Sequence, residues 1–324
     1  MSSQTNISTV PNRRAALERL WDNAGMLIVF LVMFAALSFS VPNFFSVPNL
    51  IGLSLAVSMV GMVACTMLFC LASGDFDMSV GAVVAFSGVL SAMVMQWTGS
   101  ITLGVLAALA ATTVVGLVNG FVISKLHINA LITTLATMQI VRGLGYITSN
   151  GVSVGIGQES FFDLGTGSSL GIPNPTWITI LCFVFFGFLL NKTTFGRNTL
   201  AIGGNKEAAR LSGINVDRTK IIIFALQGLM AGFAGIILAS RMTSGQPTAS
   251  NGFELDVISA CVLGGVSLSG GVGTIMGTIV GVLIMGTVQN ALNLMNVPTF
   301  YQYVVRGVIL LLAVLFDQLK QKKI

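Results

Sequence analysis

The segment NKTTFGRNTLAIGGNKEAARLSGINVDRTK, residues 191–220, is the longest clearly polar stretch between the hydrophobic blocks of this chain. It carries six of the sixteen Lys and Arg residues: Lys192, Arg197, Lys206, Arg210, Arg218 and Lys220. Apolar blocks flank it on both sides and fill most of the remaining sequence. We therefore interpret the chain as a series of membrane helices that is interrupted here by one large polar loop.

Composition places the chain in a lipid bilayer. Of its 324 residues, 54% are hydrophobic and only 8% are charged, and the mean hydropathy is +0.89. Soluble domains carry about 25% charged residues, so this chain has too little polar surface to face water. The net charge of +5 is interpreted as cytoplasmic Lys and Arg and not as a nucleic-acid surface, because no basic cluster is interleaved with aromatic residues.

Cysteine and histidine predict neither a metal site nor a catalytic site. The four cysteines lie in apolar runs without a C-x-x-C pair, where a cysteine behaves as a small hydrophobic residue: Cys65, Cys70, Cys182 and Cys261. The single histidine, His127, cannot build a metal site without a cluster of other ligands.

The predicted fold class is an all-α polytopic membrane protein with short or broken helices. A membrane span needs about 20 mostly apolar residues. Ten segments are expected on this basis: 24–41, 50–72, 79–97, 101–124, 128–148, 176–190, 221–240, 254–269, 271–293 and 300–317. No A-x-A cleavage site follows the first segment, so it is predicted to be retained as a span.

Charge counting orients these spans. With the N-terminus in the cytoplasm, thirteen of the sixteen Lys and Arg residues fall on the cytoplasmic side, as the positive-inside rule requires. Both termini are therefore predicted to be cytoplasmic. The expected organisation is a cytoplasmic segment 1–23, a single transmembrane domain 24–317 that contains the loop 191–220, and a cytoplasmic tail 318–324.

Four pairs of short signals, in the same order in both halves, predict an internal repeat. They are Leu71-Ala72-Ser73 with Leu238-Ala239-Ser240, Asp75 and Asp77 with Glu254 and Asp256, Gly116 and Asn119 with Gly286 and Gln289, and Val141-Arg142-Gly143 with Val305-Arg306-Gly307. Corresponding spans are five apart, so the halves run in opposite directions, as in many transporters. Chance similarity between two Gly-rich apolar sequences is the alternative.

Six charged residues lie in or beside the apolar spans: Asp75, Asp77, Arg142, Glu254, Asp256 and Arg306. Charges at membrane depth are costly, so they face the protein interior or water, or pair with one another. Residues 73–77 also indicate an unwound turn between helices. Three roles stay open: a polar path or gate, helix caps and ion pairs that hold the bundle together, and proton-binding groups of a secondary transporter.

The polar loop contains a short helix candidate, GGNKEAARLSG. Asn205 is suited to begin this helix and Gly213 to end it. Ala208, Leu211 and Ile214 form a small apolar edge. Two helical turns are marginal alone, so the helix is expected to lie in a partner's groove or on the membrane surface. The chain lacks G-x-x-x-x-G-K-[ST], so any ATP hydrolysis belongs to another subunit.

Four stretches carry a resemblance to a known family: LASGDFDMSVG (71–81), INALITTLATMQIVRGLGY (128–146), TTFGRNTLAIGGNKEAARLSGI (193–214) and ISACVLGGVSLSGGVGT (258–274). The chain resembles the permease subunits of bacterial ATP-binding-cassette sugar importers of the ribose/arabinose type, from Trp21 to Lys323. Within that family it is most similar to the arabinose-transporting members, through INALITTLATMQIVRG, FGRNTLAIGGN and ILASRMTSGQP (237–247).

The resemblance implies a multi-pass, non-catalytic transport subunit of the bacterial inner membrane. Two copies would form the path, two ATP-binding-cassette subunits would hold ATP and Mg, and a periplasmic binding protein would deliver the sugar. The sugar would be L-arabinose, with ribose, galactose or xylose as alternatives. The family's ATPase-coupling helix matches Gly203, Gly204, Asn205, Lys206, Glu207, Ala208, Ala209, Arg210, Leu211 and Gly213.

A neutral pentose requires hydroxyl-compatible groups along its path. By their positions within spans, the polar candidates are Asn119, Thr133, Thr134, Thr137, Gln139 and Gln289, in addition to the six charged residues. A proton-coupled sugar transporter that uses the intramembrane acids, and a passive channel, are the functional alternatives to an ATP-driven importer.

Overall fold

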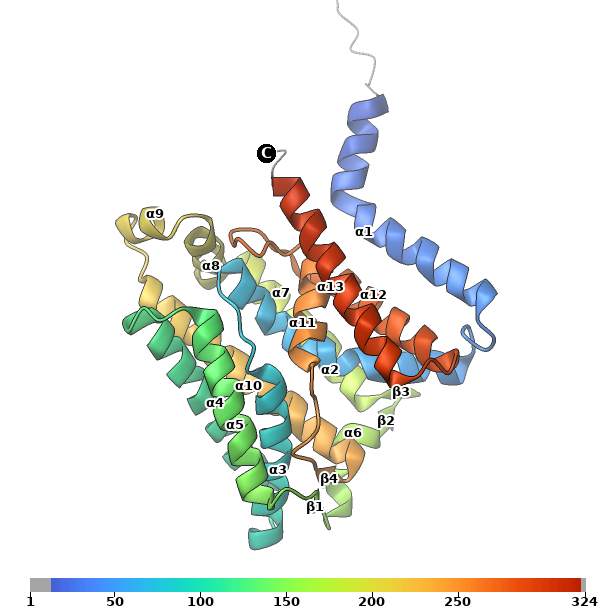
Figure 1. Ribbon diagram of the computed structural model, residues 1–324, viewed down its shortest axis with the longest axis vertical. Coiled ribbons are helices and arrows are strands. Elements are labelled where there is room, and N and C mark those ends of the chain that lie inside the picture. Colours follow the sequence, from blue (N-terminus) through green and yellow to red (C-terminus); the bar gives the residue numbers. More distant parts are fainter. Residues whose placement is uncertain (1–12, 322–324) are drawn as a thin grey trace, which may run out of the picture.

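The computed structural model describes the backbone of residues 13–321 and the side chains of residues 25–315 and 318 (Figure 1). A helix lies in each of the ten predicted spans: α1 (Arg13–Ser40), α2 (Val47–Ala72), α3 (Val80–Thr98), α4 (Ile101–Lys125), α5 (Ala130–Ser149), α7 (Asn174–Lys192), α10 (Val216–Met242), α11 (Phe253–Leu263), α12 (Ile275–Leu294) and α13 (Thr299–Gln321). The basic side chains expected at the two ends lie outside the described side chains: Arg13, Arg14, Arg19, Lys320, Lys322 and Lys323.

Seven helices of the described chain are long and apolar enough to cross a membrane: α2, α3, α4, α5, α7, α10 and α12. The prediction of a span over 254–269 is wrong in extent. Helix α11 stops at Leu263, because Gly264 and Gly265 follow and Gly265 has a φ of +83°. Eleven residues rise only about 16 Å, too little to cross a bilayer.

The polar segment 191–220 is mostly helical and is not an open loop. It contains the end of α7, then α8 (Thr194–Gly204) and α9 (Lys206–Leu211), and the first turn of α10. Figure 1 shows α8 and α9 together at one end of the bundle. Thr193 begins α8 by accepting a bond from the Gly196 amide, as N-cap residues do.

The opposite end of the bundle carries short strands and turns (Figure 1). Strand β1 (Val154–Gly155) pairs antiparallel with β4 (Ser244–Gly245), which joins the segments that follow α5 and α10. A second pair, β2 (Ser168–Ser169) with β3 (Ile172–Pro173), precedes α7. The 3-10 turn η1 (Glu159–Phe161) and α6 (Asp163–Thr166) lie between β1 and β2 in the sequence.

Helices α2, α3 and α10 are the most buried of the long apolar helices described, and α2 and α10 contact each other. Glycines lie where α4 packs against α10. A Cβ at Gly116 would strike the Phe224 carbonyl, and one at Gly232 would strike the Thr112 side chain. Small residues therefore let these two backbones approach closely, as in other membrane helix pairs.

The helix contacts of the two halves correspond. Helix α10 packs on α3 and α4 of the first half, while α2 packs on α11 and α12 of the second. Within the halves, α3 contacts α4 and α5, and α11 contacts α12 and α13. Two non-helical segments, residues 73–79 and 243–252, lead into α3 and α11 respectively, as Figure 1 shows.

Candidate functional site

The non-helical segment between α2 and α3 is tied to the start of α10 by a buried ion pair. Lys220 Nζ lies 2.6 Å from Asp75 Oδ2, and both side chains are about nine-tenths buried. Lys220 is the last residue of the polar segment, and sequence reasoning counted it only as a loop charge. Its position next to the first apolar residue of the span was the one available signal that it turns inward.

Asp77 organises a second, hydrogen-bonded network in the same segment. Its Oδ1 accepts bonds from the Ser79 amide at 2.8 Å and from the Ser79 hydroxyl at 2.6 Å. Asn119 Nδ2 donates to the Ser79 hydroxyl, and Thr137 donates to Asn119 Oδ1 at 2.6 Å. The network joins the 73–79 segment to α4 and α5. Two predicted path residues, Asn119 and Thr137, thus meet Asp77 through a serine that the sequence analysis missed.

The corresponding acids of the second half lie in the first turn of α11. Asp256 Oδ2 pairs with Arg306 NH1 of α13 at 3.2 Å, and the Asp256 side chain is mostly buried. Gln289 of α12 lies next to the same carboxylate. Two predicted path residues, Arg306 and Gln289, therefore lie beside this acid.

Arg142 holds the non-helical segment that leads into α11. Its guanidinium donates to the carbonyls of Pro247 at 3.1 Å and Ala249 at 2.7 Å. Glu254 is nine-tenths buried, and its carboxylate fills the space that a Cβ on Gly81 of α3 would need. Glu254 and the segment that leads into α11 are thus in contact with the first half.

The remaining predicted path residues lie on α5 and differ in position. Thr134 accepts a bond from the Met78 amide at 3.1 Å, so it belongs to the Asp77 region. Thr133 is buried and bonds only to the Asn129 carbonyl of its own helix. Gln139 is exposed on the outer face of α5.

The short helix α9 forms with the predicted caps. The Asn205 side chain accepts from the Ala208 amide at 2.9 Å, and the helix ends before Gly213, whose φ is +85°. Ala208 and Leu211 are exposed, Leu211 to 88%. Ile214 does not extend this apolar edge. It packs inward with the buried cluster of Ile202, Ala209 and Val216, because the chain turns at Gly213.

The end of α8 packs directly against the last residue of α2, just before the 73–79 segment. The Gly203 Cα faces the Ala72 carbonyl so closely that a Cβ would overlap that oxygen and the Gly271 amide. The Gly271 amide in turn donates to the Ala72 carbonyl at 2.9 Å. Three backbone segments therefore meet here: the end of α2, the end of α8 and the turn between α11 and α12. The end of α8 is therefore in contact with both halves of the chain.

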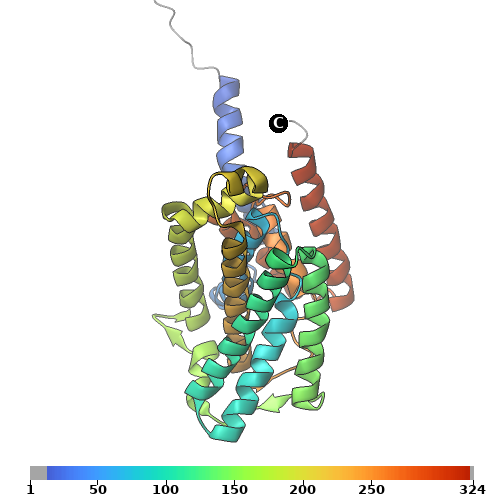
Figure 2. The same ribbon diagram turned by 90° about the vertical axis from the view of Figure 1, so that its left-hand side faces the viewer.

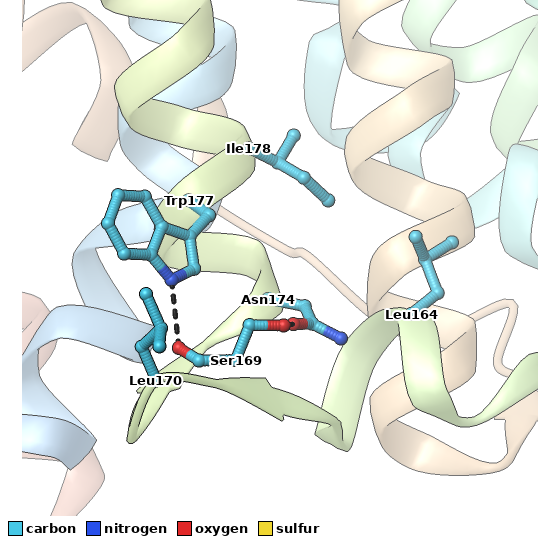
Figure 3. Close-up of a pocket in the computed structure, with 6 residues that line it drawn as sticks. All are labelled: Leu164, Ser169, Leu170, Asn174, Trp177 and Ile178. Atoms are coloured by element: carbon cyan, nitrogen blue, oxygen red, sulfur yellow. Dashed lines mark hydrogen bonds between the residues drawn. The ribbon is translucent and has the colours of Figure 1, made fainter.

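An apolar hollow opens at the opposite end, beside the β2–β3 hairpin (Figure 3). It is lined by Leu164, Ser169, Leu170, Asn174, Trp177 and Ile178. The Trp177 indole N–H donates to the Ser169 carbonyl at 3.0 Å, as the dashed line marks. No predicted site residue lines this hollow.

Comparisons with known proteins identify the chain's relatives. Residues 49–314 match the family described as "Branched-chain amino acid transport system / permease component". The chain is 62% identical to the L-arabinose transport system permease protein AraH of Escherichia coli K12, over 99% of this chain and 98% of the relative. It is 57% identical to the L-arabinose ABC transporter permease protein AraH of Azospirillum brasilense, over 96% and 91% respectively.

The ribose import permease protein RbsC of E. coli K12 is 41% identical to the chain, over 97% of this chain and 99% of the relative. No solved structure matches the chain. The family match covers most of the sequence and agrees with the multi-pass helical architecture. The chain therefore belongs to this family of membrane transport permease components.

Proposed function

We propose that the chain is the transmembrane subunit of an ATP-driven importer that carries L-arabinose across the bacterial inner membrane. The sugar assignment rests on sequence identity, which is higher to the arabinose permeases than to the ribose permease. The two relatives named for L-arabinose are 62% and 57% identical to the chain, whereas the E. coli ribose permease is 41% identical. Ribose import is the second candidate, because that relative still aligns over 97% of the chain.

Ten crossings with both termini in the cytoplasm are part of this proposal. The distribution of Lys and Arg supports the orientation, and α11 would complete its crossing with its flanking segments. The two halves then run in opposite directions. This agrees with the helix contacts, because α10 packs on α3 and α4 of the first half and α2 packs on α11 and α12 of the second. In this orientation α8 and α9 lie on the cytoplasmic side, and the β1–β4 pair lies on the periplasmic side, where a sugar-binding protein would dock.

A second copy of the chain is expected on the outer face of α5 and α13. Gln139 is exposed on α5, and an amide that faces lipid is unfavourable. Gly143 of α5 and Gly307 of α13 have no neighbour within 4 Å of an added Cβ, so small residues point outward on both helices. Such residues favour close helix contacts between subunits. In Figure 2, α5 (green) and α13 (red) both lie along the right-hand side of the bundle.

Helix α9 is proposed to dock into a partner ATPase subunit, which would hold ATP and Mg. Leu211 is 88% exposed on a helix anchored from behind by Ala209. An exposed leucine on a short, capped helix is suited to an apolar groove. Because α8 continues from this helix into the junction at Gly203, docking there would pass ATP-driven motion to both halves.

Leu211→Glu is expected to abolish co-purification of the ATPase subunit, because a charge cannot enter an apolar groove without a large desolvation cost. Co-purification is measured after expression of both subunits with a tag on the permease only. Leu170→Glu is the matched control, since Leu170 is 93% exposed on the β2–β3 hairpin at the other end of the molecule. Normal ATPase recovery with Leu211→Glu would contradict the docking role.

The energy source and the sugar are tested by uptake of labelled L-arabinose in vesicles that contain the permease, its ATPase and the binding protein. The proposal requires uptake that depends on ATP, survives an uncoupler and is competed by L-arabinose better than by ribose. Uptake that collapses with the uncoupler while ATP is maintained would identify a proton-coupled transporter instead. Uptake without binding protein or ATP would identify a passive channel.

A further inference from the structure

The polar clusters of the two halves differ in how completely they are bonded. In the first half, the polar atoms of Asp77, Ser79, Asn119 and Thr137 form a continuous chain of hydrogen bonds. In the second half, Asp256 and Gln289 are the equivalents of Asp77 and Asn119, but Ile258 follows Asp256 where Ser79 follows Asp77. The bridging hydroxyl is therefore missing from the second cluster.

Polar atoms in the second cluster remain without partners as a result. Among the described residues, Asp256 Oδ1, Gln289 Nε2 and Arg306 Nε are buried atoms that have no hydrogen-bond partner. The Gln289 amide lies next to the Asp256 carboxylate, but not at hydrogen-bonding geometry. Unpaired buried polar atoms carry a substantial free-energy cost, especially within a membrane. An occupant that both donates and accepts hydrogen bonds would remove it.

This cluster borders the exposed face of α13. Arg306 lies over the Tyr303 ring, with its Cζ 5.8 Å from the ring centroid, and the Arg306 side chain is 25% exposed. Tyr303 itself is 52% exposed. A ligand could therefore reach the unpaired atoms from the face on which Tyr303 lies. In the first half, by contrast, Asn119 is fully buried.

We propose that Asp256, Gln289 and Arg306, together with the ring of Tyr303, form a contact site for the hydroxyl groups of the transported monosaccharide. The carboxylate accepts from sugar hydroxyls, while the amide and the guanidinium donate to sugar oxygens, and these bonds are strengthened by charge. The tyrosine ring offers an apolar surface to the C–H face of the sugar. The inference rests on the proposed function, because it takes a neutral sugar as the substrate.

A site of this kind is expected to bind weakly. Asp256 already shares its other oxygen with Arg306, so part of its bonding capacity is used within the protein. Weak binding is suited to a transport path, since the substrate must leave as readily as it enters. Water is the competing occupant, and the test below distinguishes it from sugar.

The test is saturation-transfer NMR of L-arabinose with the assembled permease–ATPase complex in nanodiscs, without binding protein. Gln289→Leu and Tyr303→Leu are each expected to raise the dissociation constant at least about tenfold. Gln289→Leu should leave the unfolding temperature unchanged or higher, because it removes an unpaired polar atom. Thr287→Val is the matched control: it removes another unpaired buried atom from α12, and its sugar affinity should equal that of the unmodified complex.

Each outcome separates the site from the proposed function. Unchanged sugar affinity in both leucine variants, or no sugar signal from the unmodified complex, would overturn the site and leave ATP-driven import intact. A signal from ribose but not from L-arabinose, lost in both variants, would support the site and overturn the assigned sugar. Equal loss of affinity in Thr287→Val would show a general effect of altering α12 and would overturn the site.

Discussion

Lys220→Met is expected to destabilise the protein by about 3–5 kcal/mol, because it leaves the Asp75 carboxylate buried without its counter-ion. The two charged groups are 2.6 Å apart and both are about nine-tenths buried. The unfolding temperature of the purified protein in detergent should fall, and sugar uptake should be lost. The same change also frees the 73–79 segment from α10, so uptake should decline even at temperatures where the variant remains folded.

A second ion pair provides the control. Lys125 Nζ lies 2.9 Å from Asp217 Oδ2, but the Lys125 side chain is 52% exposed. Exposed pairs contribute about 1 kcal/mol or less, so Lys125→Met should unfold almost as the unmodified protein does. If Lys220→Met and Lys125→Met lowered the unfolding temperature equally, the buried pair would not have the importance assigned to it here.

The double variant Lys220→Met, Asp75→Leu distinguishes a role of the ion pair in stability from a role in passing motion from α10 to the 73–79 segment. Replacing a buried ion pair by apolar residues of similar size is often neutral for stability, so the double variant should recover most of the lost unfolding temperature. If the pair also transmits motion from α10 to the 73–79 segment, uptake should stay low. Recovery of both properties would assign the pair a purely structural role.

Local sequence signals predicted the elements of this fold well. Apolar runs placed a helix in each of ten positions, and Asn205 and Gly213 marked the start and end of α9. These features depend on residues close in sequence, through hydrophobic length and capping. The repeat matched Asn119 with Gln289, and the structure places each of them near an acid of its own half.

Contacts between distant segments were less predictable. The pairing of Asp75 with Lys220 joins residues 145 positions apart, and no local pattern reports it. The inward turn of Ile214 and the role of Ala209 as an anchor depend on the tertiary position of α8. The span predicted over 254–269 was too long because hydropathy does not register the backbone break at Gly264 and Gly265, where the chain turns toward α12.

Gly203→Ala is expected to reduce sugar uptake strongly. A Cβ at this position would overlap the carbonyl oxygen of Ala72 and the amide of Gly271. Both are backbone atoms and cannot rotate away, so the three segments of the junction must separate. Overpacking of this kind costs about 1–3 kcal/mol or more. Uptake in vesicles and co-purification of the ATPase are measured on the same preparation.

The neighbouring glycine makes the comparison decisive. Gly204→Ala adds the same methyl group one residue later, where no atom lies within 4 Å, so it should preserve uptake. Both changes leave Asn205, Leu211 and the exposed face of α9 intact. If Gly203→Ala retains the ATPase but loses uptake, docking and transmission are separable, and the motion must pass from α8 to the end of α2. If both variants transport sugar normally, the close packing at Gly203 is not part of the coupling route, and Lys220 remains the direct link from the polar segment to Asp75.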